Sequence, residues 1–204
     1  MTYIIIFLTV VISIVCFGNR RLADRLALRP YAVVHRNQWD RLITHGFVHG
    51  DYTHLLVNML VFWSFGSNVE RLFRTQEFAG IVRSGVLTFL LLYFGGMIFA
   101  SLYDMVRHRN DPGYASIGAS GAVSAVVFTS IFFDPLGMIY FFGVLPIPGI
   151  LFGLLYIIYE GWSGKRMADG INHNAHLFGA LYGFLFPLLI SPSLIHVFLN
   201  GLKL

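Results

Sequence analysis

Six apolar segments divided by polar connections dominate this chain and restrict what it can fold into. Of its 204 residues, 56% are hydrophobic and only 12% are charged, and the mean hydropathy is +0.70. So few charges cannot keep a soluble domain in solution, and the chain is therefore predicted to be an integral membrane protein. A helix needs about 20 apolar residues to cross ~30 Å of hydrocarbon, and the segments lie at residues 2–18, 52–69, 81–103, 116–133, 148–159 and 175–190.

The connections between these segments are predicted to be mostly irregular. Arginines alternate with leucines in residues 19–47, a pattern that favours an amphipathic loop lying in the membrane interface. Pro146 and Pro148 interrupt residues 136–150, which are expected to form a non-helical connection that dips into the interface. The polar, glycine-containing stretch 160–174 is expected to form a loop.

The fold class that follows is an all-α, polytopic membrane protein with six transmembrane helices in one domain over residues 1–204. The first segment has no Lys or Arg before it and no Ala-x-Ala site after it, so it is expected to remain as a span. Cys16 is the only cysteine of the sequence, which excludes an intrachain disulfide and a cysteine metal site. The net charge of +4 is spread over the connections, and no nucleic-acid partner is expected.

Three polar residues fall at equivalent places in this predicted bundle. His54 lies near the start of the second segment, Ser120 near the start of the fourth and His176 near the start of the sixth. Because consecutive spans alternate in direction, these three starts face the same side of the membrane. A rise of ~1.5 Å per residue keeps all three within a few helical turns of that surface, so we expect them to meet at similar depth.

Ser120 lies in the small-residue stretch Gly118-Ala119-Ser120-Gly121. Small residues and serine are common where apolar helices pack closely, so this stretch alone favours a packing role. His176 changes that interpretation, because a neutral imidazole can take the proton of a serine hydroxyl and make the serine a nucleophile. The ten acidic residues are all placed in connections or at segment ends, with none one turn from either side chain. The sequence therefore predicts a Ser-His dyad without a carboxylate.

Glycines are expected to bring the two members of this dyad together. Gly179 and Gly183 follow His176 at i+3 and i+7, so all three share one helical face. Gly121 offers a small surface beside Ser120. Close backbone contact between the fourth and sixth segments is therefore predicted.

Two further polar residues share a face of the second segment. His54 and Asn58 are spaced i, i+4, and both can donate hydrogen bonds to an oxyanion. The alternative is a structural pair that bonds a neighbouring carbonyl. His45 and His49 are also spaced i, i+4, so a three-histidine zinc site with His54 is conceivable. It is disfavoured because no carboxylate completes it and the His-Glu-x-x-His pattern is absent.

Taken together, these motifs resemble those of the rhomboid family of intramembrane serine proteases, of the minimal six-helix bacterial kind. The resemblance covers residues 39–190 and rests on three motifs in the right order: His-Gly-Asp-Tyr-Thr-His-Leu-Leu-Val-Asn at 49–58, Gly-Ala-Ser-Gly at 118–121 and Ala-His-Leu-Phe-Gly-Ala-Leu-Tyr-Gly at 175–183. It implies a six-helix rhomboid-like bundle. It also implies that Ser120 is the nucleophile, that His176 is the general base, and that His54, Asn58 and the backbone amide of Ser120 form the oxyanion hole. The positions that it implies to be structural are Arg41, His45, His49 and Glu70.

The reaction implied by the resemblance is hydrolysis of peptide bonds within or next to transmembrane segments of membrane-protein substrates, without a cofactor or a metal ion. The sequence departs from the family pattern at two places. Asp40 separates Trp39 from Arg41, which are often adjacent in the family. Ser124 occupies a position where some members carry a tyrosine that stacks on the catalytic histidine, so that stacking is expected to be lost.

Two other functions are compatible with such a bundle. A non-catalytic rhomboid-like protein would bind the transmembrane helices of client proteins, although loss of the serine or the histidine would be expected in it, and both are present. A small transporter or channel would line a path with buried polar residues and would show no covalent chemistry at Ser120.

Two arguments disagree on which side of the membrane Ser120 faces. The connections on its side hold ten of the fourteen Lys and Arg residues, which by the positive-inside rule places that side in the cytoplasm. The resemblance implies the opposite, with the site open to the non-cytoplasmic side of the cell (inner) membrane. We follow the resemblance, because the arginines of residues 19–47 are expected to fold against the bundle.

Overall fold

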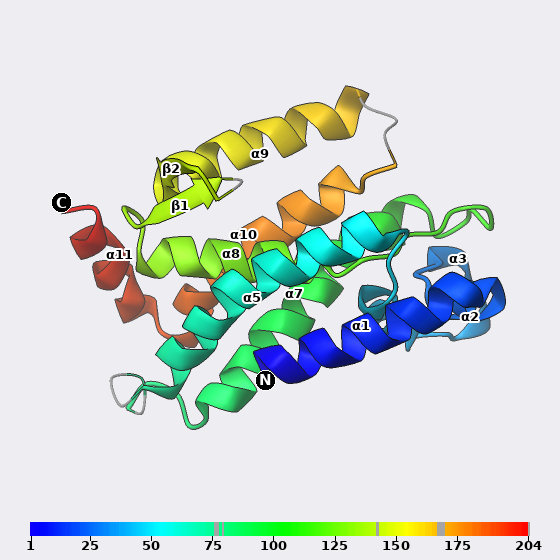
Figure 1. The fold of residues 1–204 in the computed structure, drawn as a ribbon, viewed down its shortest axis with the longest axis horizontal. Helices are drawn as coiled ribbons and strands as arrows, with labels where there is room; N and C mark the ends of the chain where they lie inside the picture. Colours follow the sequence, from blue (N-terminus) through cyan, green and yellow to red (C-terminus); the bar gives the residue numbers. More distant parts are fainter. Residues whose placement is uncertain (76–77, 79, 142, 167–169, 204) are drawn as a thin grey trace.

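Six helices of the structure correspond to the six apolar segments. The structure is a computed structural model that describes residues 1–75, 78, 80–141, 143–166 and 170–203 (Figure 1). The prediction of a mostly helical chain is confirmed. The six helices are α1 (Thr2–Gly18), α5 (Tyr52–Arg74), α7 (Gly85–Arg107), α8 (Ser120–Phe133), α9 (Gly149–Arg166) and α10 (His173–Ile190).

The described helices differ in how well they suit a membrane crossing. By length and composition, α7 and α10 are long and apolar enough to cross a membrane. The helices α1 and α8 are also apolar but shorter, with 17 and 14 residues. Two of the six predicted spans therefore meet the length and composition expected of a crossing helix, and two more meet the composition alone.

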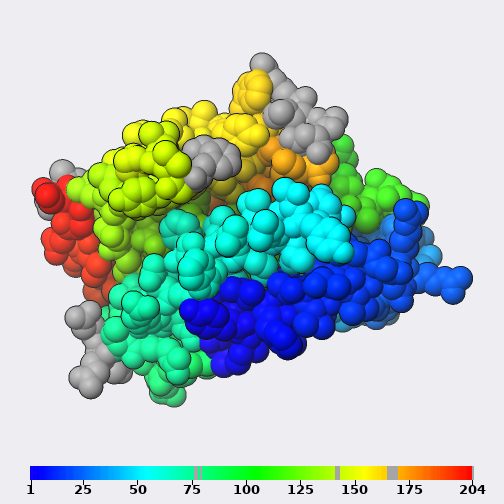
Figure 2. Space-filling view, viewed as in Figure 1, coloured from blue at the N-terminus to red at the C-terminus, as the bar shows by residue number. Residues whose placement is uncertain are grey.

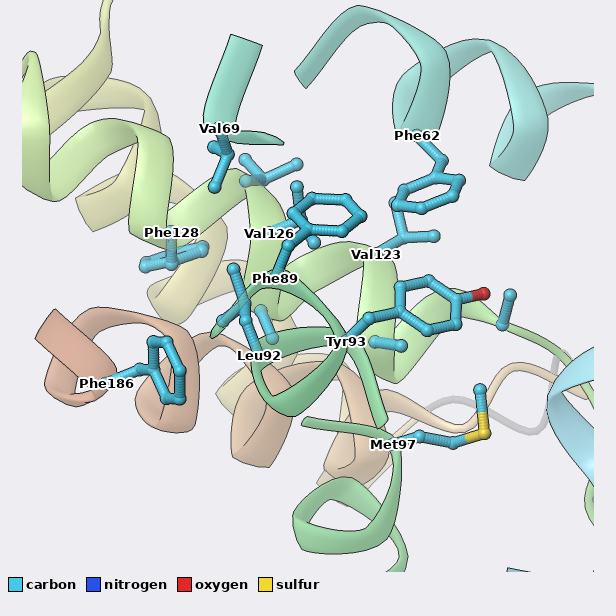
Figure 3. Packing of buried hydrophobic residues seen from close by; sticks show 14 of the residues in the cluster. Phe62, Val69, Phe89, Leu92, Tyr93, Met97, Val123, Val126, Phe128 and Phe186 are labelled. Atoms are coloured by element: carbon cyan, nitrogen blue, oxygen red, sulfur yellow. The ribbon is translucent and has the colours of Figure 1, made fainter. Parts of the chain in front are cut away.

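The core of the molecule is built around α8, which packs against α5, α7 and α10 (Figure 1). Eleven of its 14 residues are buried, and it has no polar face. A helix that is apolar all round is buried, either in the core of a protein or in a membrane. Its neighbours contribute large aromatic and aliphatic side chains to the same cluster (Figure 3), among them Phe62, Phe89, Leu92, Tyr93, Met97 and Phe186.

The backbones of α8 and α10 are in direct contact. A Cβ atom added at Gly179 would lie 2.1 Å from the carbonyl oxygen of Gly121, and one added at Gly183 would lie 2.0 Å from that of Ala125. Thr129 Oγ1 also donates a hydrogen bond of 2.7 Å to the carbonyl of Gly183. The predicted close approach of the fourth and sixth segments is confirmed, because only glycine leaves room for it.

The stretch from 19 to 47 is helical, which corrects the predicted loop. It forms α2 (Arg20–Leu26), α3 (Pro30–Arg36), α4 (Arg41–Thr44) and a 3₁₀ turn η1 (His45–Phe47). Asn19 caps α2 by accepting a hydrogen bond from the backbone amide of Leu22. The Arg41 guanidinium is buried and donates to the carbonyls of Asp24 and Ala27, at 2.7 and 2.6 Å, so it holds the end of α2 in place.

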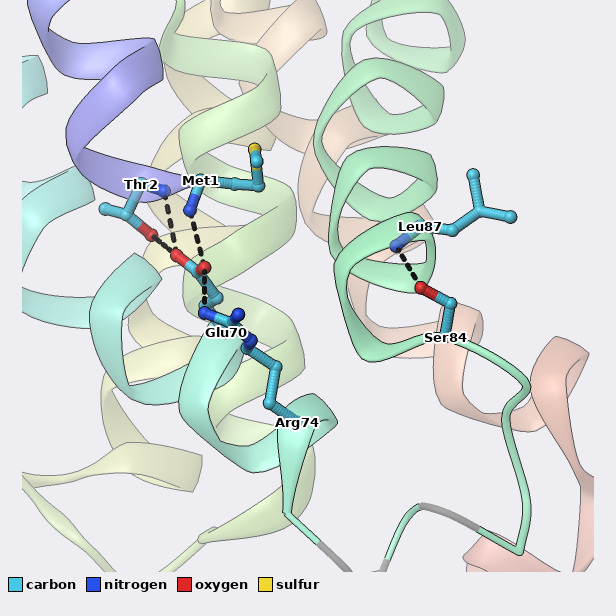
Figure 4. Close-up of polar contacts among 6 residues, drawn as sticks. All are labelled: Met1, Thr2, Glu70, Arg74, Ser84 and Leu87. Atoms are coloured by element: carbon cyan, nitrogen blue, oxygen red, sulfur yellow. Dashed lines mark hydrogen bonds and ion pairs between the residues drawn. The ribbon is translucent and has the colours of Figure 1, made fainter.

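The start of α1 is fixed to α5 by Glu70. This carboxylate accepts hydrogen bonds from the amino group of Met1 and from the backbone amide and hydroxyl of Thr2, the last two at 2.8 and 2.9 Å (Figure 4). Glu70 follows His54 by sixteen residues on the same helix, which separates the two by about 24 Å along the axis. These contacts agree with the structural position that the resemblance implies for Glu70.

Residues 136–150 contain a β-hairpin that the sequence did not predict. The strands β1 (Met138–Phe141) and β2 (Leu145–Pro148) pair antiparallel, with Tyr140 opposite Pro146. Each strand of such a pair has a free edge, so a proline without an N–H can be accommodated. The prolines therefore prevent a helix, as expected, but still allow strands.

The last third of the chain is more helical than predicted. The fifth segment was expected to end at residue 159, but α9 continues to Arg166, so Glu160 lies inside a helix rather than in a loop. After α10 the chain adds a 3₁₀ turn η2 (Pro192–Leu194) and a short helix α11 (Ile195–Gly201), which the sequence analysis did not include.

Candidate active site

Ser120 is the first residue of α8, and the loop before it is held at two points. The backbones of Leu28 and Ser116 exchange two hydrogen bonds of 2.9 and 3.0 Å, and the amide of Gly118 donates to the carbonyl of His45 at 3.0 Å. Gly118 has a φ of +120°, and a Cβ atom there would lie 2.9 Å from the His54 ring. Only glycine fits both the backbone conformation and the space.

His54 and Asn58 lie in the first two turns of α5 and face this loop. The amide of Gly50 donates a long hydrogen bond of 3.5 Å to His54 Nδ1, which favours the tautomer with the ring proton on Nε2. Asn58 is 7% exposed, and its amide donates to the carbonyl of His54 at 3.1 Å. One N–H of the Asn58 amide and the Nε2–H of His54 are left to serve as donors.

His45 and His49 are buried beside the site and are engaged with the backbone and with Ser13. His45 Nδ1 donates to the carbonyl of Arg41 at 2.8 Å, and burial lowers the pKa of His45 to about 4. Ser13 Oγ donates to the carbonyl of Phe47, so the 2.9 Å contact of Ser13 with His49 Nδ1 requires a proton on that nitrogen. Burial, with repulsion by His54, lowers the pKa of His49 to about 3. Both rings are therefore neutral near pH 7.

The three-histidine zinc site considered from the sequence does not form among the described residues. The group of possible metal ligands that does come together there, with ligand atoms within 4.8 Å of one another, consists of Glu160, His173 and His176. Its carboxylate–imidazole distances are 2.6 and 2.9 Å, which are hydrogen-bond lengths. Ligands around a tetrahedral zinc ion with bonds of 2.0–2.1 Å would lie about 3.3 Å apart.

His176 lies in the first turn of α10 and contacts a carboxylate. Its Nδ1 lies 2.9 Å from Glu160 Oε1, and the other oxygen of Glu160 lies 2.6 Å from His173 Nδ1. The expectation that no carboxylate reaches the dyad is therefore wrong. Residue 160 was placed in a loop, whereas α9 packs against α10 and turns Glu160 toward it.

A tyrosine from α9 occupies the neighbourhood of the His176 ring. The ring centroids of Tyr156 and His176 are 6.5 Å apart with an interplanar angle of 27°, and the Tyr156 hydroxyl lies 2.7 Å from Ser124 Oγ. Position 124 carries no ring, as its sequence requires, but the Tyr156 ring of another helix lies beside His176, and its hydroxyl is hydrogen-bonded to Ser124. The sequence analysis missed Tyr156, although its i, i+4 spacing from Glu160 places both on one helical face.

Asn172 fixes the start of α10 relative to α7 and to the loop before Ser120. Its side-chain oxygen accepts a hydrogen bond of 3.0 Å from the amide of Ala175 and so caps α10. Its amide nitrogen donates to Asp104 of α7 at 2.6 Å and to Ser116, in the loop before Ser120, at 3.1 Å. One side chain therefore joins α7, α10 and the serine loop.

Ser120, His176, His54 and Asn58 all line one cavity of about 900 Å³ between the starts of α5, α8 and α10. The three helix starts meet at this cavity, as predicted. Among the residues that the structure describes, no hydrogen bond joins Ser120 to His176. Hydrogen bonds between catalytic groups are often long before substrate binds and tighten in the complex. The cavity thus gathers a hydroxyl, an imidazole and two neutral donors.

Comparison with known proteins identifies the family. The Rhomboid domain family matches residues 36–193. The chain is similar to RHOMBOID-like protein 12, mitochondrial, of Arabidopsis thaliana, with 32% identity over 146 residues that cover 68% of this chain and 43% of the relative. It is similar to Rhomboid protein 1, mitochondrial, of Saccharomyces cerevisiae, with 26% identity over 155 residues, 74% of this chain and 42% of the relative. It is also similar to Rhomboid protease GluP of Bacillus subtilis, with 33% identity over 92 residues, 45% of this chain and 15% of the relative. The chain matches less than half the length of each of these relatives. Because the domain match covers most of the chain, the protein belongs to the rhomboid family.

Proposed function

We propose that this protein is an intramembrane serine endopeptidase that cleaves peptide bonds in or next to the transmembrane segments of membrane-protein substrates. The observation that carries the proposal is the single cavity lined by Ser120, His176, His54 and Asn58. Membership of a family in which a relative is named a rhomboid protease supports it.

The reaction would proceed through an acyl-enzyme on Ser120. Nε2 of His176 takes the hydroxyl proton while Ser120 Oγ attacks the scissile carbonyl carbon. The tetrahedral intermediate then collapses, the C–N bond breaks, and His176 returns the proton to the leaving amine. Water repeats the sequence on the ester, with His176 again accepting and returning a proton, and releases the second product.

The charge that develops on the carbonyl oxygen would be stabilised by neutral donors around Ser120. His54 Nε2–H and the second N–H of Asn58 line the same cavity as the serine. Ser120 opens α8, and Ala119 before it makes no side-chain cap, so the first amides of the helix are available for the oxyanion. No metal ion or cofactor is needed for any of these steps.

The proposal includes six membrane crossings by α1, α5, α7, α8, α9 and α10 in one domain over residues 1–204. Large apolar side chains are exposed on five of these helices, all except α8. They support the proposal, because the hydrocarbon of a membrane favours an apolar surface. Figure 2 shows one face of the molecule, with α1 and α5 along it and α9 above them. The exposed side chains include Tyr3, Phe7, Leu56, Trp63 and Ile158.

We further propose that the cavity opens to the non-cytoplasmic side of the cell membrane. Asn110 lies in the exposed connection before the serine loop. With Cys16 removed, a cysteine placed at Asn110 should react with a membrane-impermeant maleimide on intact cells. Labelling only after the membrane is opened would place the cavity in the cytoplasm, as the count of basic residues suggests.

Cleavage of a single-span substrate in liposomes tests the proposed activity. Ser120→Ala and His176→Ala should each abolish cleavage while the proteins remain folded, and the double variant should be no worse, because nucleophile and base act as a unit. Cleavage that survives in folded Ser120→Ala would contradict the proposal. Substrate binding without cleavage by the native protein would instead favour the client-binding alternative.

A further inference from the structure

We propose that Glu160 is a positioning residue for His176, so that the site operates as Ser-His-Glu rather than as a dyad. The inference rests on the proposed function of Ser120 and His176 as nucleophile and base. The shared hydrogen bonds of Glu160 with two histidines of α10 carry it.

The contact fixes which nitrogen of His176 carries the proton. An ionised carboxylate can only accept hydrogen bonds, so the 2.9 Å contact with Glu160 Oε1 requires a proton on His176 Nδ1. The neutral ring then has an unprotonated Nε2, on the side of the imidazole away from Glu160. This tautomer is the one that can accept a proton from a serine hydroxyl.

Glu160 is itself held firmly enough to orient the ring. Its side chain is 5% exposed, and its second oxygen accepts from His173 Nδ1 at 2.6 Å. His173 precedes His176 by three residues on the first turns of α10, so one carboxylate bridges two neighbouring rings on one helix face. The hydroxyl of Tyr156, one turn before Glu160 on α9, is fixed by Ser124. Two contacts therefore hold the face of α9 that meets His176: Glu160 is bound to His173, and Tyr156 is bound to Ser124.

The charge of Glu160 gives a second effect during the reaction. When His176 takes the proton of Ser120, the ring becomes an imidazolium ion, and its side chain is only 16% exposed. A carboxylate already in hydrogen-bond contact stabilises that ion without having to reorganise. Glu160 does not receive the proton, and it touches neither substrate nor reacting atoms.

A purely structural role is the competing explanation, because Glu160 also ties α9 to α10. The two roles predict different kinetics. Loss of a structural tie lowers the amount of folded enzyme but leaves the turnover of each folded molecule unchanged. Loss of a positioning group lowers kcat of the folded enzyme with little change in KM.

The experiment compares Glu160→Gln and Glu160→Asp with the native protein in liposomes, using the single-span substrate and a fluorophosphonate probe. The Gln side chain keeps the size but loses the charge, and its NH₂ group cannot accept from a histidine. We expect kcat and the probe reaction rate to fall by about 10²–10⁴-fold, with KM within about twofold. The Asp variant keeps the charge on a shorter side chain and should recover part of the loss.

Glu70→Gln is the matched control, because it makes the same change at a buried carboxylate that accepts several hydrogen bonds far from the cavity. It should lower the unfolding temperature and leave kcat of the folded enzyme unchanged. A folded Glu160→Gln with native kcat would overturn the inference. If Glu160→Gln does not fold, Glu160→Ala takes its place, and native kcat in folded Glu160→Ala would overturn the inference equally.

The failure of the proposed function would look different. In that case the native protein and Ser120→Ala would behave alike towards substrate and probe, whatever residue stands at position 160.

Discussion

Gly179 of α10 packs directly on the backbone of Gly121 of α8, the residue after Ser120. A Cβ atom at Gly179 would lie 2.1 Å from the Gly121 carbonyl oxygen. Because that atom belongs to the backbone, the steric clash could be relieved only if the two helices moved apart. Because His176 lies one turn before Gly179, this contact sets the spacing between the proposed base and nucleophile. Packing and chemistry therefore depend on the same pair of helices.

Gly179→Ala should separate these helices and reduce both stability and cleavage. A methyl group that meets backbone in a packed core typically costs 1–3 kcal/mol, and a displacement of even 1 Å at the site can lower the rate about 10²-fold. Thermal unfolding and kcat of the purified variant check this. Gly161→Ala in α9 is the control, because its Cβ meets nothing within 4 Å and alanine favours a helix over glycine. Equal behaviour of the two variants would contradict the account.

Gly118→Ala should disturb His54 as well as the backbone. The new Cβ would lie 2.9 Å from the His54 ring, at a φ of +120° that alanine rarely adopts. Gly143→Ala offers a matched comparison, since its φ is +73° but its Cβ would meet nothing within 4 Å. Both variants should lose about 1–3 kcal/mol of stability, but only Gly118→Ala should lose turnover. Native turnover in folded Gly118→Ala would remove His54 from the proposed mechanism.

Asn58→Ala should lower kcat by about 10²-fold with little effect on KM, as expected for a lost oxyanion donor. Asn68→Ala is a close control, because the Asn68 amide also donates to the carbonyl four residues earlier in α5, at 3.0 Å, but on an exposed face. Steady-state kinetics of the two variants separate the roles. If Asn58→Ala turns over at the native rate, the role of Asn58 is limited to its hydrogen bond with the carbonyl of His54.

Acid should destabilise the protein through His45. Burial lowers the pKa of this ring from its usual 6.5 to about 4, so between these values the unfolded chain binds a proton that the folded protein does not. The stability is fully present above about pH 6.5 and falls by up to about 1.4 kcal/mol per pH unit as the pH drops towards 4. Unfolding temperatures of native protein and His45→Asn across this window check the sign. His45→Asn should be less stable at pH 7 but less sensitive to acid, and parallel curves would contradict this.

The six helices could be predicted because long apolar runs stand out in any sequence, and the meeting of His54, Ser120 and His176 at one cavity follows from counting the runs. Glu160 could not be placed in the same way. The residues after Tyr159 are polar and rich in glycine, and they suggested a loop. The predicted segment of residues 148–159 was too short to cross a membrane, and extending it by two turns would have brought Glu160 into the helix.

Other features depended on contacts that no local pattern reveals. The buried Arg41 donates to the carbonyls of Asp24 and Ala27, a contact that no periodicity of the arginine-rich stretch predicts. Tyr156 of α9 places a ring beside His176, although position 124 of α8 carries none. Tertiary packing decided both, and a sequence gives no distance between helices.

Covalent labelling of Ser120 tests the central claim most directly. A fluorophosphonate probe is added to the purified native protein, and the modified residue is located by mass spectrometry. The account predicts an adduct on Ser120 Oγ that is lost in Ser120→Ala and strongly reduced in His176→Ala. A folded native protein that stays unlabelled under conditions in which a soluble serine hydrolase is labelled, or that carries the adduct on another residue, would contradict it.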